Sequence, residues 1–199
     1  MKWWLYAALI AVIATIGVTK WNRAQVIERA PGMLVREEPL QTETKTPPFW
    51  DGKYRFRPLF DFKCRARVLS VKHYVDDRES EFCPTDLALG WGKMSDTAVL
   101  NQFSDISQSV RHVFLEWQDP PMPQEEFMPL VANMHIIPAD DDLKRELRRV
   151  KKGEIVEFSG HLVEVTAADG FRMRSSTTRL DWKGGACEVV YIKSLKHGL

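Results

Sequence analysis

Three segments of the sequence combine residue types that could bind a ligand or take part in catalysis. In the first, DLALGWGKMSD at residues 86–96, Trp91 lies between Gly90 and Gly92. Glycine on both sides permits left-handed backbone, so the indole could be presented as a stacking platform for a sugar, a base or a partner side chain. A tryptophan that closes the core beneath a tight loop fits the same residues. Trp91 is therefore a candidate ligand-binding residue with a core role as the alternative.

The second segment, NMHIIP, holds a single histidine among apolar neighbours. His135 could act as a general base, a metal ligand or a pH-sensitive group. A core histidine with one satisfied hydrogen bond has the same surroundings, so both interpretations stay open.

The third segment is the polar run SSTTRLD at residues 175–181. Hydroxyl groups beside Arg179 could bind an oxyanion or a phosphate. A hydroxyl-rich turn that satisfies its own backbone, with Arg179 paired to Asp181, explains the same residues. We take Ser175, Ser176 and Arg179 as candidate ligand-binding residues.

Basic and apolar residues alternate between residues 60 and 68. Lys63, Arg65 and Arg67 would share one face of a strand and could line a groove for a polyanion, either nucleic acid or lipid headgroups. By the same alternation Phe60 and Phe62 point to the opposite face, which argues against stacking on nucleic-acid bases. These three basic residues form a candidate polyanion patch.

Several strong catalytic and metal-binding motifs do not occur in the sequence: C-x-x-C, H-E-x-x-H, G-x-S-x-G, S-x-x-K and the P-loop. The five histidines have no ligand spacing, so we predict no metal and no cofactor. Three cysteines are too few for a disulfide framework. One bridge between Cys64 and Cys83 stays possible for an exported chain, although Cys64 falls on an apolar face. No sequence pattern supplies a base for a catalytic cysteine.

Charge is distributed unevenly along the chain. The 199 residues include 28 Lys+Arg and 27 Asp+Glu, for a formal net charge of +1, but residues 76–142 carry 14 acidic and 3 basic side chains between basic flanks. The near-zero total argues against a nucleic-acid partner held by bulk charge. The segments could neutralise one another as neighbours in one fold. A composition of 44% hydrophobic and 28% charged residues excludes wholesale disorder.

The hydrophobic pattern predicts the elements that would position these residues. Period-two alternation over 60–68 predicts a half-buried strand. Residues 138–152 predict a helix, because Asp140–Asp142 suit the positive end of its dipole, the basic residues at 148–152 suit the negative end, and Gly153 ends it. Strand patterns follow at 155–166 and 171–175, joined by an Asp169-Gly170 turn, and at 188–192. Gly160 within the first of these predicts a bulge or bend.

The N-terminal end predicts a membrane anchor. The run WWLYAALIAVIATIGV at 3–18 carries no charge and is flanked by Lys2, Lys20 and Trp21, as in a spanning helix. A cleaved signal peptide is the alternative, but no A-x-A site follows the run. We therefore expect a transmembrane anchor over 1–21, a flexible Pro/Thr-rich tether over 22–50 and a single soluble domain over 51–199. The positive-inside count favours a cytoplasmic domain and the short basic head favours export; we favour the periplasm.

Together these patterns predict an α+β protein, with an N-terminal transmembrane helix followed by a compact β-rich, small barrel-like domain with one well-capped helix. The segments DLALGWGKMSD, ISQS at 106–109, NMHIIPA, SSTTR and GACE at 185–188 together resemble a family of uncharacterised bacterial proteins with an N-terminal membrane segment. The resemblance covers about residues 55–195. It implies a bacterial inner-membrane setting and transfers no activity and no catalytic residues.

Three functions fit these expectations. The first is a membrane-tethered, non-catalytic binding or assembly module of the bacterial cell envelope, with a protein partner and with a recognition surface at Trp91, His135 and the 175–179 turn. The alternative is a small envelope hydrolase that uses His135 with a hydroxyl or carboxylate partner, such as Ser175, Ser176 or Asp140. The third is a polyanion-binding β-barrel that uses Arg65 and Arg67.

Overall fold

The computed structural model describes residues 26–178 and 187–199. The strands are β1 (Leu40–Glu43), β2 (Phe49–Asp51), β3 (Tyr54–His73), β4 (Thr85–Gly90), β5 (Asp105–Ser109), β6 (His112–Glu116), β7 (Val131–Pro138), β8 (Ile155–Ala167), β9 (Arg172–Arg174) and β10 (Glu188–Lys196). The α-helices are α2 (Thr97–Leu100), α3 (Gln124–Phe127) and α4 (Asp141–Leu147), and the 3₁₀ turns are η1 (Arg78–Glu81), η2 (Gly92–Ser95) and η3 (Met128–Leu130). The chain is β-rich with a few short helices, as the predicted α+β class requires.

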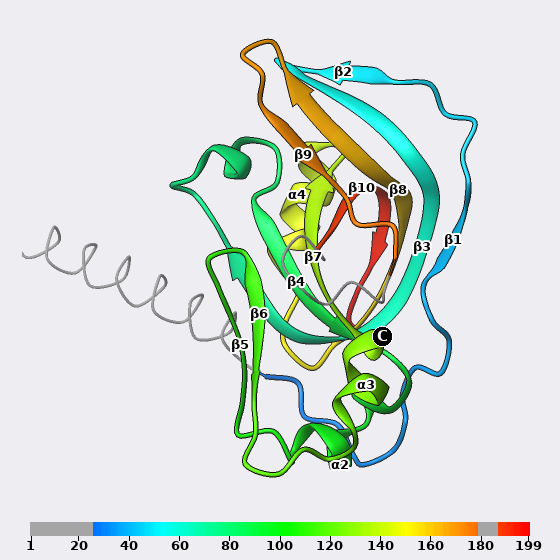
Figure 1. Ribbon diagram of the computed structural model, residues 1–199, viewed down its shortest axis with the longest axis vertical. Helices are drawn as coiled ribbons and strands as arrows, with labels where there is room; N and C mark the ends of the chain where they lie inside the picture. The colour runs from blue at the N-terminus through cyan, green and yellow to red at the C-terminus, as the bar shows by residue number, and fades with distance from the viewer. Residues whose placement is uncertain (1–25, 179–186) are drawn as a thin grey trace, which may run out of the picture.

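Five strands close into a barrel (Figure 1). β3 pairs with β4, β4 with β7, β7 with β10 and β10 with β8, and β8 returns to β3. The pair β7–β10 is parallel, and the other four pairs are antiparallel. In the chain, α4 follows the third barrel strand and precedes the fourth. This strand order, with the helix at that position, is the topology of the OB-fold, a small Greek-key barrel.

The barrel interior is filled by alternate side chains of its strands. Phe62, Cys64, Ala66 and Val68 of β3 are each at most 2% exposed and belong to one buried cluster. The strand predicted over 60–68 is therefore confirmed, within a longer strand. The four other barrel strands add to the same cluster, among others, Leu87, Leu89, Met134, Ile136, Phe158, Leu162, Val190 and Ile192.

A hairpin inserted between the second and third barrel strands lies against the outside of the barrel. β5 and β6 pair only with each other among the residues that are described. Ile106 of β5 packs with Ala88 of β4 and Phe127 of α3 in a second buried cluster. In Figure 1 the hairpin runs alongside β4, so its tip is carried to the outer face of the barrel wall.

The N-terminal segment differs from the flexible tether predicted for 22–50. From residue 26 onward it packs on the domain: the Ile27 amide donates to the Lys152 carbonyl at 2.8 Å, and the Leu34 and Val35 amides donate to the Ser95 hydroxyl at 3.1 and 3.0 Å. Val35 is fully buried, and β1 and β2 both pair with β3. The proline-rich segment is extended, as expected. It is held on β3, because the edge of β3 at this end offers backbone groups with which β1 and β2 pair.

The helix predicted over 138–152 is shorter than expected. Asp140 caps it by accepting from the Leu143 amide at 2.8 Å, as its sequence position suggests, but α4 ends at Leu147. The chain then turns so that the Gly153 amide can donate to the Val68 carbonyl at 2.8 Å, with Gly153 at a φ of 90°. A Cβ atom there would lie 1.9 Å from the Ile27 carbonyl oxygen, so only glycine fits this close approach.

The strands predicted at the C-terminal end are confirmed as β8, β9 and β10, with Gly170 at a φ of 88° in the turn after β8. Gly160 allows the Tyr191 carbonyl oxygen to come within 1.9 Å of where a Cβ atom would be, and the register shift lies opposite it, between Ile192 and Ser194 of β10. Across the part of the chain that is described, no helix is both long and apolar enough to cross a bilayer. The anchor expected over 1–21 lies outside the described residues.

Candidate active site

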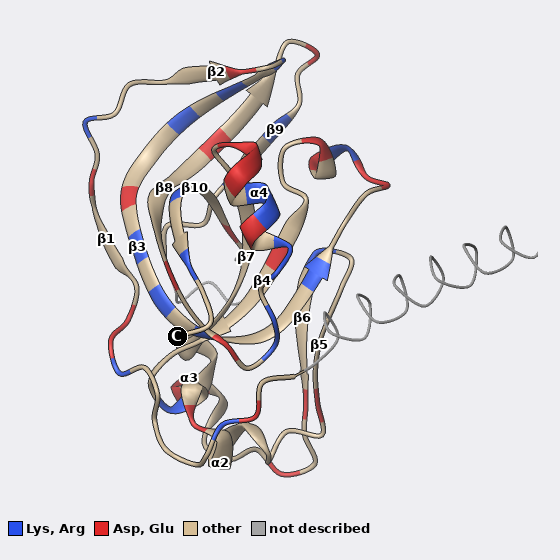
Figure 2. Ribbon diagram, turned by 180° about the vertical axis from the view of Figure 1, so that it is seen from behind, with Lys and Arg blue, Asp and Glu red and all other residues tan. Residues whose placement is uncertain are grey.

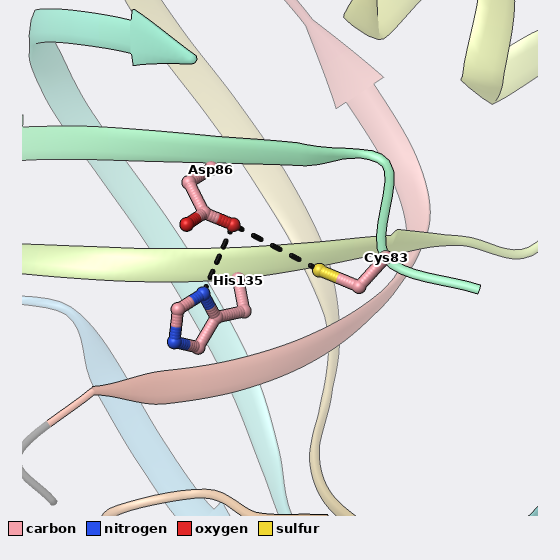
Figure 3. Close-up of side chains that lie close together, drawn as sticks. All are labelled: Cys83, Asp86 and His135. Atoms are coloured by element: carbon pink, nitrogen blue, oxygen red, sulfur yellow. Dashed lines mark hydrogen bonds and ion pairs between the residues drawn. The ribbon is translucent and has the colours of Figure 1, made fainter. Parts of the chain in front are cut away.

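A carboxylate and an imidazole form a buried pair on the outer face of the barrel wall. Asp86 of β4 and His135 of β7 are opposite each other in the antiparallel register, and both alternate with residues of the barrel interior. Asp86 Oδ1 lies 2.9 Å from His135 Nδ1 (Figure 3), although the ring N–H does not point straight at the oxygen. Asp86 is fully buried and His135 is 5% exposed. The contact is therefore a desolvated ion pair.

The Cys187 thiol contacts the same imidazole from the start of β10, the strand that pairs with the other edge of β7. Cys187 directly precedes β10, in which Val189 is opposite His135, and it is partly exposed. Burial alone lowers the pKa of His135, but the contacts with Asp86 and with Cys187 outweigh it and raise the pKa to about 9. His135 is therefore an imidazolium at neutral pH. With Nδ1 turned to Asp86, Nε2 is the ring nitrogen left to exchange a proton with a thiol or a substrate.

The hairpin tip supplies a second cation to the same oxygen of Asp86. Arg111, between β5 and β6, donates from Nη1 to Asp86 Oδ1 at 3.0 Å and from Nη2 to Asp77 Oδ1 at 2.6 Å. Its guanidinium also stacks on the Tyr74 ring, 4.0 Å from the centroid. The hydrogen bond from Arg111 holds the pKa of Asp77 below its usual value. Arg111 thereby joins the hairpin to the loop before β4 and to the barrel wall.

Two amide side chains fix the tip against β7. Gln108 Nε2 donates to Asn133 Oδ1 at 2.6 Å, and Asn133 Nδ2 donates to the Arg111 carbonyl at 2.9 Å. Cys187 Sγ is 3.8 Å from that same carbonyl oxygen. The thiol beside His135 and the guanidinium beside Asp86 therefore both depend on one backbone position of the hairpin.

The turn that carries Arg111 is strained. Val110 has a φ of 47° and Arg111 a φ of 63°, values of the type I′ turn that usually requires Asn-Gly. A β-branched residue in this region is a conformational outlier, with a cost of about 1–3 kcal/mol. Val110 is 79% exposed, so its side chain gains little from packing. The contacts of Arg111 are what hold the turn in place.

Cys83, Asp86 and His135 also form a cluster with the spacing of metal ligands, since their ligand atoms all lie within 4.8 Å of one another. The donor set fits a metal poorly, because Arg111 Nη1 already lies 3.7 Å from Cys83 Sγ and 3.0 Å from Asp86 Oδ1. Burial, and then the charge of Asp86, raise the pKa of Cys83 well above its ordinary value, so this thiol stays neutral. Metal ligation requires a thiolate. The guanidinium supplies the positive charge that a metal would otherwise bring.

Trp91 does not present a stacking platform. Its side chain is fully buried in the barrel cluster, so the core alternative describes it and the binding prediction needs correction. The neighbouring glycines serve the turn instead: Gly92 has a φ of 52°, and a Cβ atom on Gly90 would lie 2.4 Å from the Met94 carbonyl.

Ser175 and Ser176 lie next to Cys187, and their described hydrogen bonds to this segment are with its backbone groups. The Ser176 amide donates to the Cys187 carbonyl, and the Val189 amide donates to Ser175 Oγ, both at 3.0 Å. Ser175 and Ser176 therefore satisfy nearby backbone, as the alternative for this run predicts, and position Cys187, whereas the expected pair of Arg179 with Asp181 lies outside the described residues. Among the described contacts neither serine bonds to His135; Asp140 instead caps α4. Arg179 lies outside the described residues.

The candidate polyanion patch is divided by the structure. Lys63 and Arg65 are exposed on β3, but Arg67 is 7% exposed. Arg67 donates to the Ser95 carbonyl at 3.0 Å and to Thr97 Oγ1 at 2.7 Å. Its role is to hold η2 and α2 on the barrel, which corrects its inclusion in the patch.

His135 is identifiable in the sequence as a candidate, but Asp86 and Cys187, which contact it, and Arg111, which contacts Asp86, are not. Asp86 and Cys187 occur in the segments DLALGWG and GACE, yet nothing in their spacing relates them to position 135. Two adjacent residues at positive φ, neither of them glycine, gave no sequence signal for the Arg111 turn. No protein-family model, no curated protein and no solved structure matches this chain.

Proposed function

We propose that this chain is a thiol-dependent acyl-transfer enzyme of the hydrolase type. Cys187 is the nucleophile, His135 carries the proton, and Asp86 is the positioning residue that orients and charges the imidazole. The observation that carries the proposal is that one imidazole contacts both a buried carboxylate and a partly exposed thiol. Nucleophile, base and orienting carboxylate are the three parts of a cysteine hydrolase site.

The hydrolase alternative from the sequence is therefore favoured over the non-catalytic module, with Asp86 as the carboxylate partner of His135. Cys187 is the suitable thiol of the three. Cys64 is enclosed in the barrel interior, and Cys83 is fully buried beside Asp86. Of the three thiols, Cys187 is the one that is partly exposed and in contact with the His135 imidazole, which is the placement of a reactive cysteine.

The chemistry balances in two steps. The Cys187 thiolate attacks the carbonyl carbon of an ester, thioester or amide, the bond from that carbon to the leaving group breaks, and the His135 imidazolium gives its proton to the leaving group. Water then attacks the resulting thioester, and neutral His135 takes a proton from it. The bond between Sγ and the acyl carbon breaks, which releases the acid and restores the thiolate and the imidazolium.

The apolar run at 3–18 and the resemblance to bacterial membrane-anchored proteins support a cell-envelope setting. In this proposal the enzyme is a single-pass protein of the inner membrane, with its barrel in the periplasm. A reporter fused after Leu199 tests the orientation: activity of a periplasm-dependent reporter supports it, and activity of a cytoplasm-dependent reporter contradicts it.

Alkylation of the full chain in neutral detergent tests the thiol–imidazole pair. We expect iodoacetamide to modify Cys187 at pH 7 faster than Cys64 or Cys83, as measured by peptide mass spectrometry. His135→Gln should slow Cys187 alkylation about tenfold at pH 7, because the variant loses the cation beside the thiol. His73→Gln, which removes an exposed histidine of β3, is the matched control.

Incubation with p-nitrophenyl acetate tests catalysis itself. We expect one acetyl group on Cys187, a burst of p-nitrophenol of about one equivalent and no burst from Cys187→Ala. Alkylation at pH 7 that is equally slow with and without His135, together with no acetyl group on Cys187, would refute the enzyme and return the binding module as the better hypothesis.

A further inference from the structure

A second polar surface lies at the far end of β3 and β8, where β2 and β9 extend the sheet. Two cross-strand rows share its exposed face. The first contains Trp50, Arg55, Thr166 and Arg172, and the second contains Arg57, Glu164 and Arg174. We call the four arginines the arginine patch. In Figure 2 basic bands on β3 and β9 flank an acidic band on β8 at this end of the molecule.

The only acid in these rows organises the arginines around it. Glu164 Oε2 accepts from Arg57 Nε at 2.8 Å and Nη2 at 2.5 Å, while Oε1 accepts from Arg172 Nε at 2.7 Å and contacts its Nη2 at 2.6 Å. The side chain of Glu164 is 8% exposed. Each guanidinium contacts one carboxylate oxygen through two of its nitrogens, so both guanidiniums are oriented before any ligand arrives.

The arrangement leaves cationic donors without a protein partner. A carboxylate offers about four acceptor sites, and Arg57 and Arg172 occupy them. Arg174 Nη1 stays 3.6 Å from Oε1, and Arg55 has no ion pair within residues 26–178 and 187–199. One glutamate against four arginines leaves three uncompensated positive charges. An ion pair whose only role was to attach β9 to β8 would need Glu164 and one arginine, so the other arginines are not explained by that role.

We infer that the arginine patch binds a ligand that carries two or more phosphate groups. Guanidinium groups match phosphate oxygens in geometry as well as in charge, and one face with several fixed guanidiniums selects a multivalent anion over a single one. Arg57, Arg172 and Arg174 are 43%, 64% and 45% exposed at their side chains, so their remaining N–H groups are accessible. The site is independent of the acyl-transfer proposal.

Calorimetric titration of the full chain in neutral detergent with inorganic pyrophosphate and tripolyphosphate tests this site. We expect saturable binding that is tighter for tripolyphosphate and weakens as salt is raised. The informative variant is Arg55→Gln with Arg174→Gln, because it leaves the contacts of Glu164 with Arg57 and Arg172 intact. It should weaken binding about tenfold or more.

Arg145→Gln with Arg149→Gln is the matched control, since it removes two exposed arginines of the α4 region and changes the net charge equally. It should leave the affinity unchanged. Equal loss in both double variants, or no saturable heat with the natural chain, overturns the site. Micelles doped with cardiolipin, a lipid that carries two phosphates, distinguish two sources of the same chemistry: competition with pyrophosphate identifies a lipid headgroup, and an unchanged affinity identifies a soluble phosphate compound.

Discussion

Arg111 and Asp86 are 25 residues apart in the sequence and meet with 3.0 Å between Nη1 and Oδ1. The arginine comes from the tip of an inserted hairpin, and the carboxylate comes from the barrel wall. Asp86 Oδ1 thus contacts both a guanidinium and the His135 imidazole. Because Asp86 is fully buried, it needs this compensation, and the hairpin tip is part of the site.

Removal of the guanidinium should therefore destabilise the fold. We expect Arg111→Met to lower the free energy of unfolding by about 3–5 kcal/mol, because Asp77 and Asp86 lose their shared cation while Asp86 stays buried. Denaturant unfolding of the full chain measures it. Arg145→Met, which removes an exposed arginine, should change stability by no more than about 0.5 kcal/mol. Equal effects of the two substitutions would contradict the role given to Arg111.

Substitution of Val110, the other residue of the strained turn, should have the opposite effect on stability. Val110→Asn should raise stability by about 1 kcal/mol, since asparagine tolerates a φ of 47° better than a β-branched residue does. The exposed valine side chain has little packing to lose. A rise in the melting temperature would support this, and a fall would mean that the valine side chain has a role in the turn.

Stability should also depend on the protonation of His135. Its pKa in the fold is about 9, above the ordinary 6.5, so the protonated imidazole stabilises the fold. This contribution, about 3 kcal/mol, is complete below pH 6.5 and is lost as the pH rises through 9. His161, whose pKa burial lowers, acts in the opposite sense at acidic pH.

The contribution of His135 is obtained from the difference in unfolding free energy between the natural chain and His135→Gln, measured between pH 7 and pH 10. We expect the natural chain to lose stability over this range, and His135→Gln to lose less. Parallel curves for the two proteins would show that the imidazolium does not stabilise the fold.

Metal addition distinguishes the guanidinium from a metal as the cation of the site. We expect Co²⁺ to give no thiolate-to-cobalt absorption band with the natural chain, because Arg111 lies among Cys83, Asp86 and His135 and Cys83 stays neutral. A band that Cys83→Ala abolishes would contradict this. Alkylation of Cys187 should likewise be the same with and without EDTA.

The sequence by itself determined the local elements. Alternation between 60 and 68 placed Phe62 and Cys64 on the inner face of β3, and Asp140 marked the start of α4, because these features depend on neighbours two to four residues away. It also identified His135 as a residue that could do chemistry.

Only the tertiary structure decided what His135 meets. Three barrel strands bring Asp86 and Cys187 to it across 49 and 52 positions of sequence, and a hairpin tip brings Arg111 to Asp86 across 25. The same closure buried Trp91 in the core, one of the two roles that its local pattern allowed, and Arg67 beneath η2, although the alternation along β3 predicted exposure for Arg67. A strand pattern specifies which face a side chain takes but not what covers that face, because the cover comes from distant segments and is selected by burial and charge compensation over the whole fold.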